Sequence, residues 1–512
     1  MAAAGVKWVR VFPEWNRIEP SSGTWNWSEL DAMLSAADDC HVNLSGLLLY
    51  NVPWINPNPH TFPTNNFSAW SIYVSNVVAH AAGRVRYWEV WNEPESFAAG
   101  GTPADYARLV TNAWRAAKAA HPNAQIGLSV ASVDVLYLEK AIQAGAADHF
   151  DYICVHPYEL LGTLDSGQEV LYLSIVPTIR KMLAARNPAR QDVPIWFTEL
   201  GEELTERVTP ERQAQVLVKA YTMGIAQGVS RIQWFEAQEG GYRMGLLDSN
   251  FKPTPGYSAL KNLAANLGPK PVYRGWLHMD HRDYAFLFQG ASTTVLVAWA
   301  PRNRTDRVVL GSNSQILDPL TGSLTTAEDF PLTDSPVLVL GVSSNLVSQA
   351  ELNRSQPFPW PETPLDASSI SATLGGTNSE HGLHQLRADA TSTAVTVDGG
   401  PARDCGEASG VSFTVDPNFL SYTTVPIKIT AVVRRNAANQ NGGFNLKYES
   451  TSGRKSIGWN SVPGNDRWYT LSWTIADDEF VGSWGFHFSF DSDSKGNSQY
   501  LLQQVTLTKM GD

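Results

Sequence analysis

Short apolar runs alternate with longer amphipathic stretches from residue 1 to about residue 268. The runs span four to eight residues and are rich in β-branched and aromatic side chains, so they predict β-strands. Seven such runs occur, at residues 7–12, 43–50, 86–91, 125–130, 152–155, 195–198 and 231–235. The stretches at 102–121, 169–186 and 210–227 have the length and polarity of helices. Strands that alternate with helices in this way predict a parallel α/β fold.

The pattern changes after residue 268, where alternating apolar and polar positions replace the helical stretches. Runs at 284–289, 294–298 and 337–342 predict a small antiparallel β domain of sandwich type over residues 269–350. Residues 356–364 contain four prolines and predict a stiff linker. From 365 to 512, strand-like runs separated by Gly, Asn, Asp and Ser predict a β-sandwich of jelly-roll type. We therefore expect three domains, at 1–268, 269–350 and 365–512.

The overall composition is that of a multidomain globular protein, with 512 residues, 43% hydrophobic and 17% charged. A net charge of −12 disfavours nucleic acids and anionic membranes as partners, because both require a basic surface. No run approaches the roughly 18 apolar residues that a membrane-spanning helix needs. The N-terminus lacks the pattern of a signal peptide. We nevertheless expect a secreted or extracellular protein in its native form, and the sequence leaves the oligomeric state open.

The three cysteines, Cys40, Cys154 and Cys405, form neither a disulfide framework nor a metal-binding spacing. Cys154 lies within an apolar run and is expected to be a small core residue. The sequence therefore predicts no cofactor. Asp491 and Asp493 leave a structural Ca²⁺ in the C-terminal domain open, although their loop lacks EF-hand spacing.

Two of the predicted strands end at a glutamate. The run 86–91 leads into Asn92, Glu93 and Pro94, and proline marks a strand end because it cannot donate to a ladder. The run 195–198 leads in the same way into Glu199. Carboxyl ends of parallel strands in a barrel open on the same face, so the two glutamates are expected to converge. Paired carboxylates supply the acid and the nucleophile that hydrolysis of a glycosidic bond requires.

The motif Trp91-Asn92-Glu93-Pro94 resembles the acid/base motif of the retaining glycoside hydrolases of clan A, which are built on TIM barrels. The flanking sequences are most similar to families 39 and 5. The resemblance implies that Glu93 is the proton donor, that Glu199 is the nucleophile and that Asn92 binds a sugar hydroxyl. It also implies a carbohydrate substrate and a retaining double displacement. The C-terminal domain resembles carbohydrate-binding modules in size, position and texture.

The order of the motifs departs from clan A in one respect. In that clan the acid/base ends the fourth barrel strand and the nucleophile the seventh, whereas here they end the third and the sixth. The expected fold is therefore a (β/α)8-type TIM barrel that lacks its first βα unit, followed by the two β domains.

Further site candidates stand at other strand ends. Arg10 is a cation within an apolar strand and should have a carboxylate partner, because an unpaired buried charge is costly. The resemblance implies that Arg10 lies near Glu199 and that Trp234 forms the floor of the sugar site. It also implies that His156 and Tyr158 contact the substrate or the nucleophile, with Tyr158 favoured over His156 as the partner of Glu199. The other candidates follow strand ends and could line the cleft: Trp15, Tyr50, Trp54 and Glu236. Rival carboxylates are Glu14, Glu89, Glu95, Glu202, Glu203, Glu236 and Glu239.

Two classes of function fit these patterns. The first is a retaining β-glycoside hydrolase, with a β-xyloside, a β-galactoside or a β-glucan as its substrate. The second is a non-catalytic carbohydrate-binding protein on a degraded barrel, an alternative that the missing strand keeps open. A further alternative is that a second chain supplies the missing strand. The C-terminal domain has four tryptophans that could stack against a bound sugar: Trp459, Trp468, Trp473 and Trp484. The alternative is that each of them packs in the core of the domain.

Overall fold

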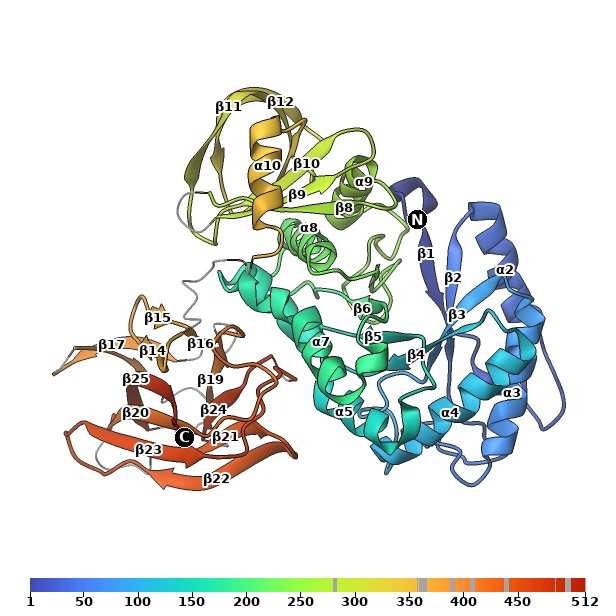
Figure 1. The fold of residues 1–512 in the computed structure, drawn as a ribbon, viewed down its shortest axis with the longest axis horizontal. Coiled ribbons are helices and arrows are strands. Elements are labelled where there is room, and N and C mark those ends of the chain that lie inside the picture. Colours follow the sequence, from blue (N-terminus) through green and yellow to red (C-terminus); the bar gives the residue numbers. More distant parts are fainter. Residues whose placement is uncertain are drawn as a thin grey trace. The chain divides into compact units, whose positions relative to one another are not determined.

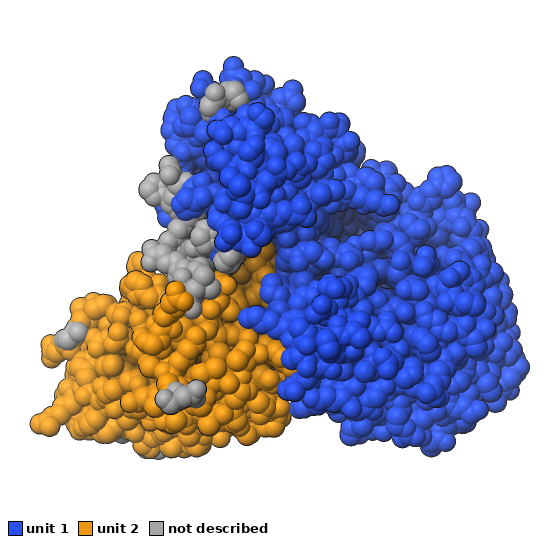
Figure 2. Space-filling view, viewed as in Figure 1, with its two compact units in different colours: residues 1–133, 137–167, 175–358 blue, residues 134–136, 168–174, 359–512 orange. Residues whose placement is uncertain are grey.

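The computed structural model describes residues 1–279, 283–356, 358, 366–386, 392–398, 400–405, 410–436, 442–483, 485–492 and 499–511. The chain divides into two compact units. The first comprises Met1–Val133, Tyr137–Gly167 and Ile175–Phe358, and the second comprises Asp134–Leu136, Gln168–Ser174 and Pro359–Asp512 (Figure 2). The expected boundary at residue 268 falls inside the first unit.

The first unit contains a sheet of seven strands, all parallel and in sequential order. The strands are β1 (Trp8–Val11), β2 (Asn43–Leu48), β3 (Val85–Val90), β4 (Gln125–Ser129), β5 (Tyr152–Val155), β6 (Ile195–Leu200) and β7 (Arg231–Trp234). Helices connect them and cover the outer face of the sheet (Figure 1). This architecture confirms the predicted TIM-barrel type.

The longer helices are α2 (Ser28–Cys40), α3 (Phe67–Ala81), α4 (Pro103–Ala120), α7 (Ile175–Arg186), α8 (Pro210–Ala226) and α9 (Pro255–Leu267). Three shorter ones are α1 (Trp15–Ile18), α5 (Val135–Ala141) and α6 (Tyr158–Leu161). The helix expected over 169–186 is divided into the 3₁₀ helix η4 (Glu169–Ser174) and α7. Within the described residues, no helix combines the length and the apolar character needed to cross a membrane.

The barrel lacks an eighth strand in the part of the chain that the structure describes, and β7 is not paired with β1. Side chains join the two edges instead. The Arg231 guanidinium of β7 stacks on the Trp8 ring of β1 at 4.7 Å, and the Gln233 Nε2 donates to the Ser45 Oγ of β2 at 3.0 Å. The predicted seven-stranded barrel is confirmed, and its open edge is bridged by side chains.

The barrel interior has an aromatic layer and a polar layer, because residues two apart on a strand face the same side. The rings of Trp8, Tyr87, Tyr152 and Trp196 contact one another with centroids 4.6 to 5.7 Å apart. Two residues further along each strand stand Arg10, Glu89, Cys154 and Thr198. The aromatic layer therefore fills the barrel, and the polar layer lies nearer the carboxyl ends of the strands.

The remainder of the first unit is one six-stranded antiparallel sheet in the order β12-β11-β13-β10-β9-β8. Its elements are β8 (Val272–Trp276), β9 (Tyr284–Gln289), β10 (Thr294–Trp299), β11 (Asp306–Leu317), β12 (Leu324–Leu332), β13 (Val337–Leu340) and α10 (Ser344–Asn353). The small β domain is confirmed, but its described strands form a single sheet, so the sandwich expected there is wrong. Arg302 and Arg212 both pair with Asp165, at 3.3 and 2.5 Å, which links this domain to the barrel.

The second unit contains two antiparallel sheets, of seven and five strands. The seven-stranded sheet holds β14 (Ser369–Thr373), β15 (Ser379–His381), β17 (Thr393–Val397), β18 (Gly400–Asp404), β20 (Ile427–Arg435), β23 (Tyr469–Ile475) and β25 (Tyr500–Lys509). The five-stranded sheet holds β16 (Leu383–Gln385), β19 (Gly410–Val415), β21 (Gly443–Ser450), β22 (Gly453–Ser461) and β24 (Phe488–Asp491).

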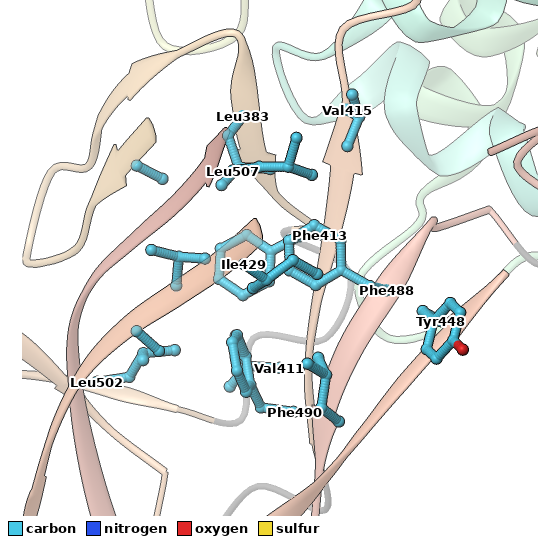
Figure 3. Packing of buried hydrophobic residues seen from close by; sticks show 14 of the residues in the cluster. Leu383, Val411, Phe413, Val415, Ile429, Tyr448, Phe488, Phe490, Leu502 and Leu507 are labelled. Atoms are coloured by element: carbon cyan, nitrogen blue, oxygen red, sulfur yellow. The ribbon is translucent and has the colours of Figure 1, made fainter. Parts of the chain in front are cut away.

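The core of the second unit is formed by side chains from both sheets. Phe413, Phe488 and Phe490 of one sheet and Ile429 and Leu507 of the other are all buried in it (Figure 3). Two sheets that share one apolar core are a β-sandwich, as the sequence predicts. The predicted linker, apart from Gln356 and Phe358, lies outside the described residues, as do Trp484 and Asp493.

Candidate active site

The two glutamates at the ends of β3 and β6 converge at the carboxyl end of the barrel. One carboxylate oxygen of Glu93, one of Glu199 and a ring nitrogen of His156 all lie within 4.8 Å of one another. Both glutamate side chains are 16% exposed, so a ligand can reach them. The expectation that residues 106 positions apart in the sequence meet at one site therefore agrees with the structure.

The turn after β3 holds Glu93 in an unusual backbone conformation. Trp91 and Glu93 both have left-handed φ values, +63° and +46°, which cost a non-glycine residue roughly 1 kcal/mol or more each. The surroundings of Trp91 hold this turn in place. Its indole is fully buried, its Nε1 donates to the Phe97 carbonyl, and its backbone N–H donates to the Leu48 carbonyl of β2. Strain of this kind is common where a side chain must be aimed at a functional site.

Glu199 is held by a cation and a hydroxyl. Arg10 Nη1 lies 2.6 Å from Glu199 Oε2, and the Tyr158 hydroxyl donates to Oε1 at 2.8 Å. Both contacts favour the ionised carboxylate. The partner expected for Arg10 and the contact expected between Tyr158 and Glu199 are both present. Burial, followed by the charge of Glu199, raises the pKa of Tyr158 well above its usual range, so its hydroxyl keeps the proton that it donates.

Glu93 is held by His156, whose Nδ1 lies 2.8 Å from Glu93 Oε1. The other ring nitrogen, Nε2, lies 3.1 Å from the hydroxyl of Thr198. Burial alone would lower the pKa of His156, but hydrogen bonds with Glu89 and Glu93 raise it to about 9. The imidazole is completely buried, so the prediction that His156 contacts substrate is wrong. Its contacts are with the carboxylates instead.

Glu89 is a site residue whose role the sequence did not reveal. It is 2% exposed and accepts hydrogen bonds from Arg10 Nε at 2.9 Å, Ser129 Oγ at 2.7 Å and Thr198 Oγ1 at 3.2 Å. Burial alone would raise the pKa of Glu89, but the Arg10 charge and the contacts with His156 lower it to about 2. One feature of the sequence could have indicated this role. Glu89 is an acidic residue within an apolar strand, and Arg10 on another strand of the same barrel needed a carboxylate partner.

Two of the residues predicted to bind sugar lie beside Glu93 and Glu199. The Asn92 Oδ1 accepts from Arg10 Nη2 at 3.0 Å. Tyr50 is half-buried, and its ring contacts His60 and Trp91 with centroids 4.6 and 5.1 Å away. Burial raises the pKa of the Tyr50 hydroxyl to about 12. Asn92 and Tyr50 are therefore neutral groups next to the carboxylates and can hydrogen-bond a sugar hydroxyl.

The tryptophans of the first two loops have different surroundings. Trp15 is completely buried, donates to Glu19 Oε2 at 2.7 Å and stacks on Tyr73, so the prediction that it lines the cleft is wrong. Trp15 is a packing residue. Trp54 is half-buried, and its Nε1 donates a hydrogen bond to the Glu19 carbonyl at 3.2 Å.

The residues predicted at the end of the last strand are both half-buried. Trp234 donates to the Met244 carbonyl at 2.9 Å, and Glu236 Oε1 accepts from the Gly240 N–H at 2.9 Å. These hydrogen bonds fix both side chains to the loop that follows β7. Their part in sugar binding stays a prediction.

Glu93, His156 and Glu199 could also supply three ligands to a metal ion, because their oxygen and nitrogen atoms are close enough. The donor set is nevertheless already used within the protein. His156 Nδ1 faces Glu93, and the two oxygens of Glu199 face Arg10 and Tyr158. The positive charge of Arg10 also balances the carboxylates. The arrangement therefore fits acid–base and nucleophilic chemistry better than metal binding.

Comparisons with known proteins give a fold and distant relatives. No family model matches this chain. Two endo-1,4-β-xylanases of Phanerodontia chrysosporium, A and C, are 26% and 27% identical to it over 221 and 223 residues. These matches cover 40% of this chain and 50% and 51% of the relatives, so the chain spans about half the length of the curated relatives it matches.

A family 39 glycoside hydrolase from the gut symbiont Bacteroides cellulosilyticus WH2 has a similar structure, with a TM-score of 0.57 and 20% identity. The match covers 66% of this chain and 76% of that one. Over the matched part, the fold of this chain is therefore similar to that of the family 39 hydrolase.

Proposed function

We propose that this protein is a retaining glycoside hydrolase that cleaves β-linked glycosides, with Glu93 as the acid/base and Glu199 as the nucleophile. The observation that carries the proposal is the approach of their carboxylate oxygens to within 4.8 Å. Retaining enzymes hold their two carboxyl groups about 5–5.5 Å apart, whereas inverting enzymes need about 6.5–9.5 Å to admit a water molecule. The distance supports the retaining mechanism.

In the first step, Glu93 gives its proton to the glycosidic oxygen while a Glu199 oxygen bonds to the anomeric carbon. The bond to the leaving sugar breaks, and a covalent ester with Glu199 forms. In the second step, Glu93 removes a proton from water, the water oxygen bonds to the anomeric carbon, and Glu199 leaves as a carboxylate. Arg10 and Tyr158 hold Glu199 ionised and in one position before the attack.

The substrate that we propose to test first is a β-1,4-linked xylan or an aryl β-xyloside. This choice rests on the two Phanerodontia relatives, which are endo-1,4-β-xylanases. Asn92 and Tyr50 are the proposed sugar-binding side chains beside the glutamates, and Trp54 and Trp234 are the proposed aromatic surfaces further out. We further propose that the β-sandwich of the second unit binds carbohydrate. Trp459 on β22 is 44% exposed and is the first candidate for a sugar-binding ring there.

The test is hydrolysis of nitrophenyl β-xylosides, β-galactosides and β-glucosides and of xylan by the full chain. The wild type should release product whose first-formed anomer is β, as measured by NMR. Glu199→Ala should reduce turnover to background. Glu93→Ala should lower kcat by about 10²–10⁴-fold on substrates with poor leaving groups. Unchanged turnover in Glu199→Ala would refute the assignment of the nucleophile.

A second candidate function is carbohydrate binding without catalysis, and the observation that favours it is the seven-stranded barrel. A protein of this kind would hydrolyse none of the glycosides in the panel but would still bind xylo-oligosaccharides in calorimetry. Binding that is weakened by Trp54→Ala, in a wild type without turnover, would support this alternative over the first proposal.

A further inference from the structure

Glu89 lies below the two proposed catalytic glutamates and contacts both Arg10 and His156, the side chains that hold them. Arg10 donates from Nε to Glu89 at 2.9 Å and from Nη1 to Glu199 at 2.6 Å. His156 lies between Glu89, 3.6 Å from its Nε2, and Glu93, 2.8 Å from its Nδ1. Glu89 itself is too deeply buried to contact a sugar. Any influence on the reaction must therefore pass through Arg10 and His156.

The hydrogen bonds around Thr198 define which nitrogen of His156 carries a hydrogen. The Thr198 hydroxyl donates to Glu89 Oε1 at 3.2 Å, so its oxygen is left to accept from His156 Nε2 at 3.1 Å. The Nε2–H is therefore donated to the Thr198 hydroxyl, and Glu89 Oε1 lies 3.6 Å from the same nitrogen. The contact between His156 Nδ1 and Glu93 Oε1 then needs one more proton, held by either atom, because two lone pairs would repel each other at 2.8 Å.

We propose that Glu89 is a positioning residue that keeps the acid/base proton on the His156–Glu93 pair. The negative charge of Glu89 attracts the positive end of the pair, so the pair releases its last proton at a higher pH than it would without Glu89. In the first reaction step that proton passes to the leaving-group oxygen. This inference rests on the proposed function, because it assigns a purpose to the proton that Glu93 donates.

Other charged and titratable groups also face this network. Arg10 opposes Glu89, while Tyr106, Tyr152 and Cys154 lie near Glu89 and are neutral, because burial raises the pKa of each well above its usual range. The groups near Glu93 are Tyr50, Tyr158 and Glu199. Among these, Glu89 is the ionised carboxylate nearest to Nε2 of His156, so its removal should dominate the change in proton affinity of the pair.

The decisive variant is Glu89→Gln in the full chain, with kcat/KM measured against pH. The alkaline limb should move to lower pH by about one unit or more, since one charge within 4–6 Å shifts an ionisation by about 1–3 units. Glu89→Asp retains the charge, so its alkaline limb should stay within a few tenths of a unit of the wild type even if the rate falls. A merely structural role would lower the rate without moving the limb.

The matched control is Glu139→Gln, which removes another buried carboxylate that pairs with an arginine. Glu139 Oε1 lies 2.7 Å from Arg186 Nε on the outer side of the barrel, away from the network. This variant should leave both the rate and the alkaline limb unchanged. An unmoved alkaline limb in a folded Glu89→Gln protein would overturn the proposal.

A measurement on the wild type separates this proposal from the proposed function and does not require Glu89→Gln to fold. The ring nitrogens of His156, labelled with ¹⁵N and assigned by comparison with His156→Gln, report the proton directly. Titration of His156 above about pH 8 supports the proposal, even for a protein without glycosidase activity. Titration near the ordinary value of about 6.5 overturns it, whatever the activity.

Discussion

At the scale of single residues, the site gives each proposed catalytic glutamate its own hydrogen-bond donors. Glu199 is held by Arg10 and Tyr158, and Glu93 by His156. Two carboxylates so close together would repel each other if both were ionised without partners. The donor sets differ in charge and position, and this difference allows one carboxylate to act as nucleophile while the other holds a proton.

Tyr158→Phe removes one of the two donors to Glu199 without changing the shape of the ring. A hydrogen bond to a charged group is worth about 1.5–3 kcal/mol, so kcat/KM should fall about 10-fold or more. Tyr221→Phe is the control, since that hydroxyl donates to the Ile232 carbonyl at 3.4 Å, and it should keep wild-type kinetics.

Glu159, next to Tyr158, should make stability depend on pH. Burial raises its pKa to about 8, so the folded state holds this proton more tightly than the unfolded state does. The resulting stability is complete below about pH 4.3 and is lost as pH rises toward 8. Urea denaturation should therefore show Glu159→Gln gaining about 1 kcal/mol or more relative to the wild type over this range. The control is Glu206→Gln, at an exposed position, and its free energy of unfolding should equal that of the wild type at every pH. If the free energy of unfolding of Glu159→Gln also equalled that of the wild type, the expectation for Glu159 would be wrong.

At the scale of elements, strands β3 and β6 position the glutamates, and close backbone contact keeps their ends together. Gly201 follows β6, and a Cβ there would lie 2.1 Å from the Phe235 carbonyl oxygen after β7. Only glycine fits this approach. After β3, the left-handed turn at Trp91 and Glu93 fixes the position of the strand end in a similar way. The geometry of the site therefore depends on two short backbone segments, each fixed by its neighbours.

Helix α4, which follows the loop after β3, begins with a capping box. The Thr102 hydroxyl accepts from the Asp105 N–H at 3.1 Å, and the Asp105 carboxylate accepts from the Thr102 N–H at 3.2 Å. Thr102→Ala should lower the free energy of unfolding by about 0.5–2 kcal/mol in urea denaturation, with little change in kcat. Ser71→Ala within α3 is the control, because its hydroxyl bonds to the Phe67 carbonyl within the helix, and it should cost less than about 0.5 kcal/mol.

At the scale of the whole molecule, one chain bridges its own open barrel edge. The contact of Arg231 with Trp8 and the bond from Gln233 to Ser45 span the positions where an eighth strand would pair. The first unit also includes the small β domain, which is tied to the barrel through Asp165. Contacts within one chain therefore already connect the two edges of the barrel.

Specific activity should for this reason be independent of protein concentration. Dilution from about micromolar to about nanomolar should leave turnover per chain constant, with sedimentation velocity run in parallel to record the oligomeric state. Activity that falls together with dissociation would show that a second copy completes the barrel. Arg231→Ala is the matched variant, since it should lower the melting temperature without making activity depend on concentration.

The sequence by itself determined the alternation of strands and helices, the change to β domains and the two strand-end glutamates. These features follow from local periodicity and from strand direction: proline stops β3, and parallel strands open on one face of a barrel. The seven-strand count and the need of Arg10 for a carboxylate partner were also readable, because both depend on patterns within single segments.

Only the tertiary structure decided which side chains share the inner layers of the barrel. Trp15, expected at the cleft, is packed in the core, and His156, expected at the sugar, bridges Glu89 and Glu93. Whether a residue after a strand points to solvent or inward depends on the loops above it, and local patterns do not record that. Glu89 gained its partners from four other strand ends, and contacts between residues so far apart in sequence exist only once the sheet has curved into a barrel.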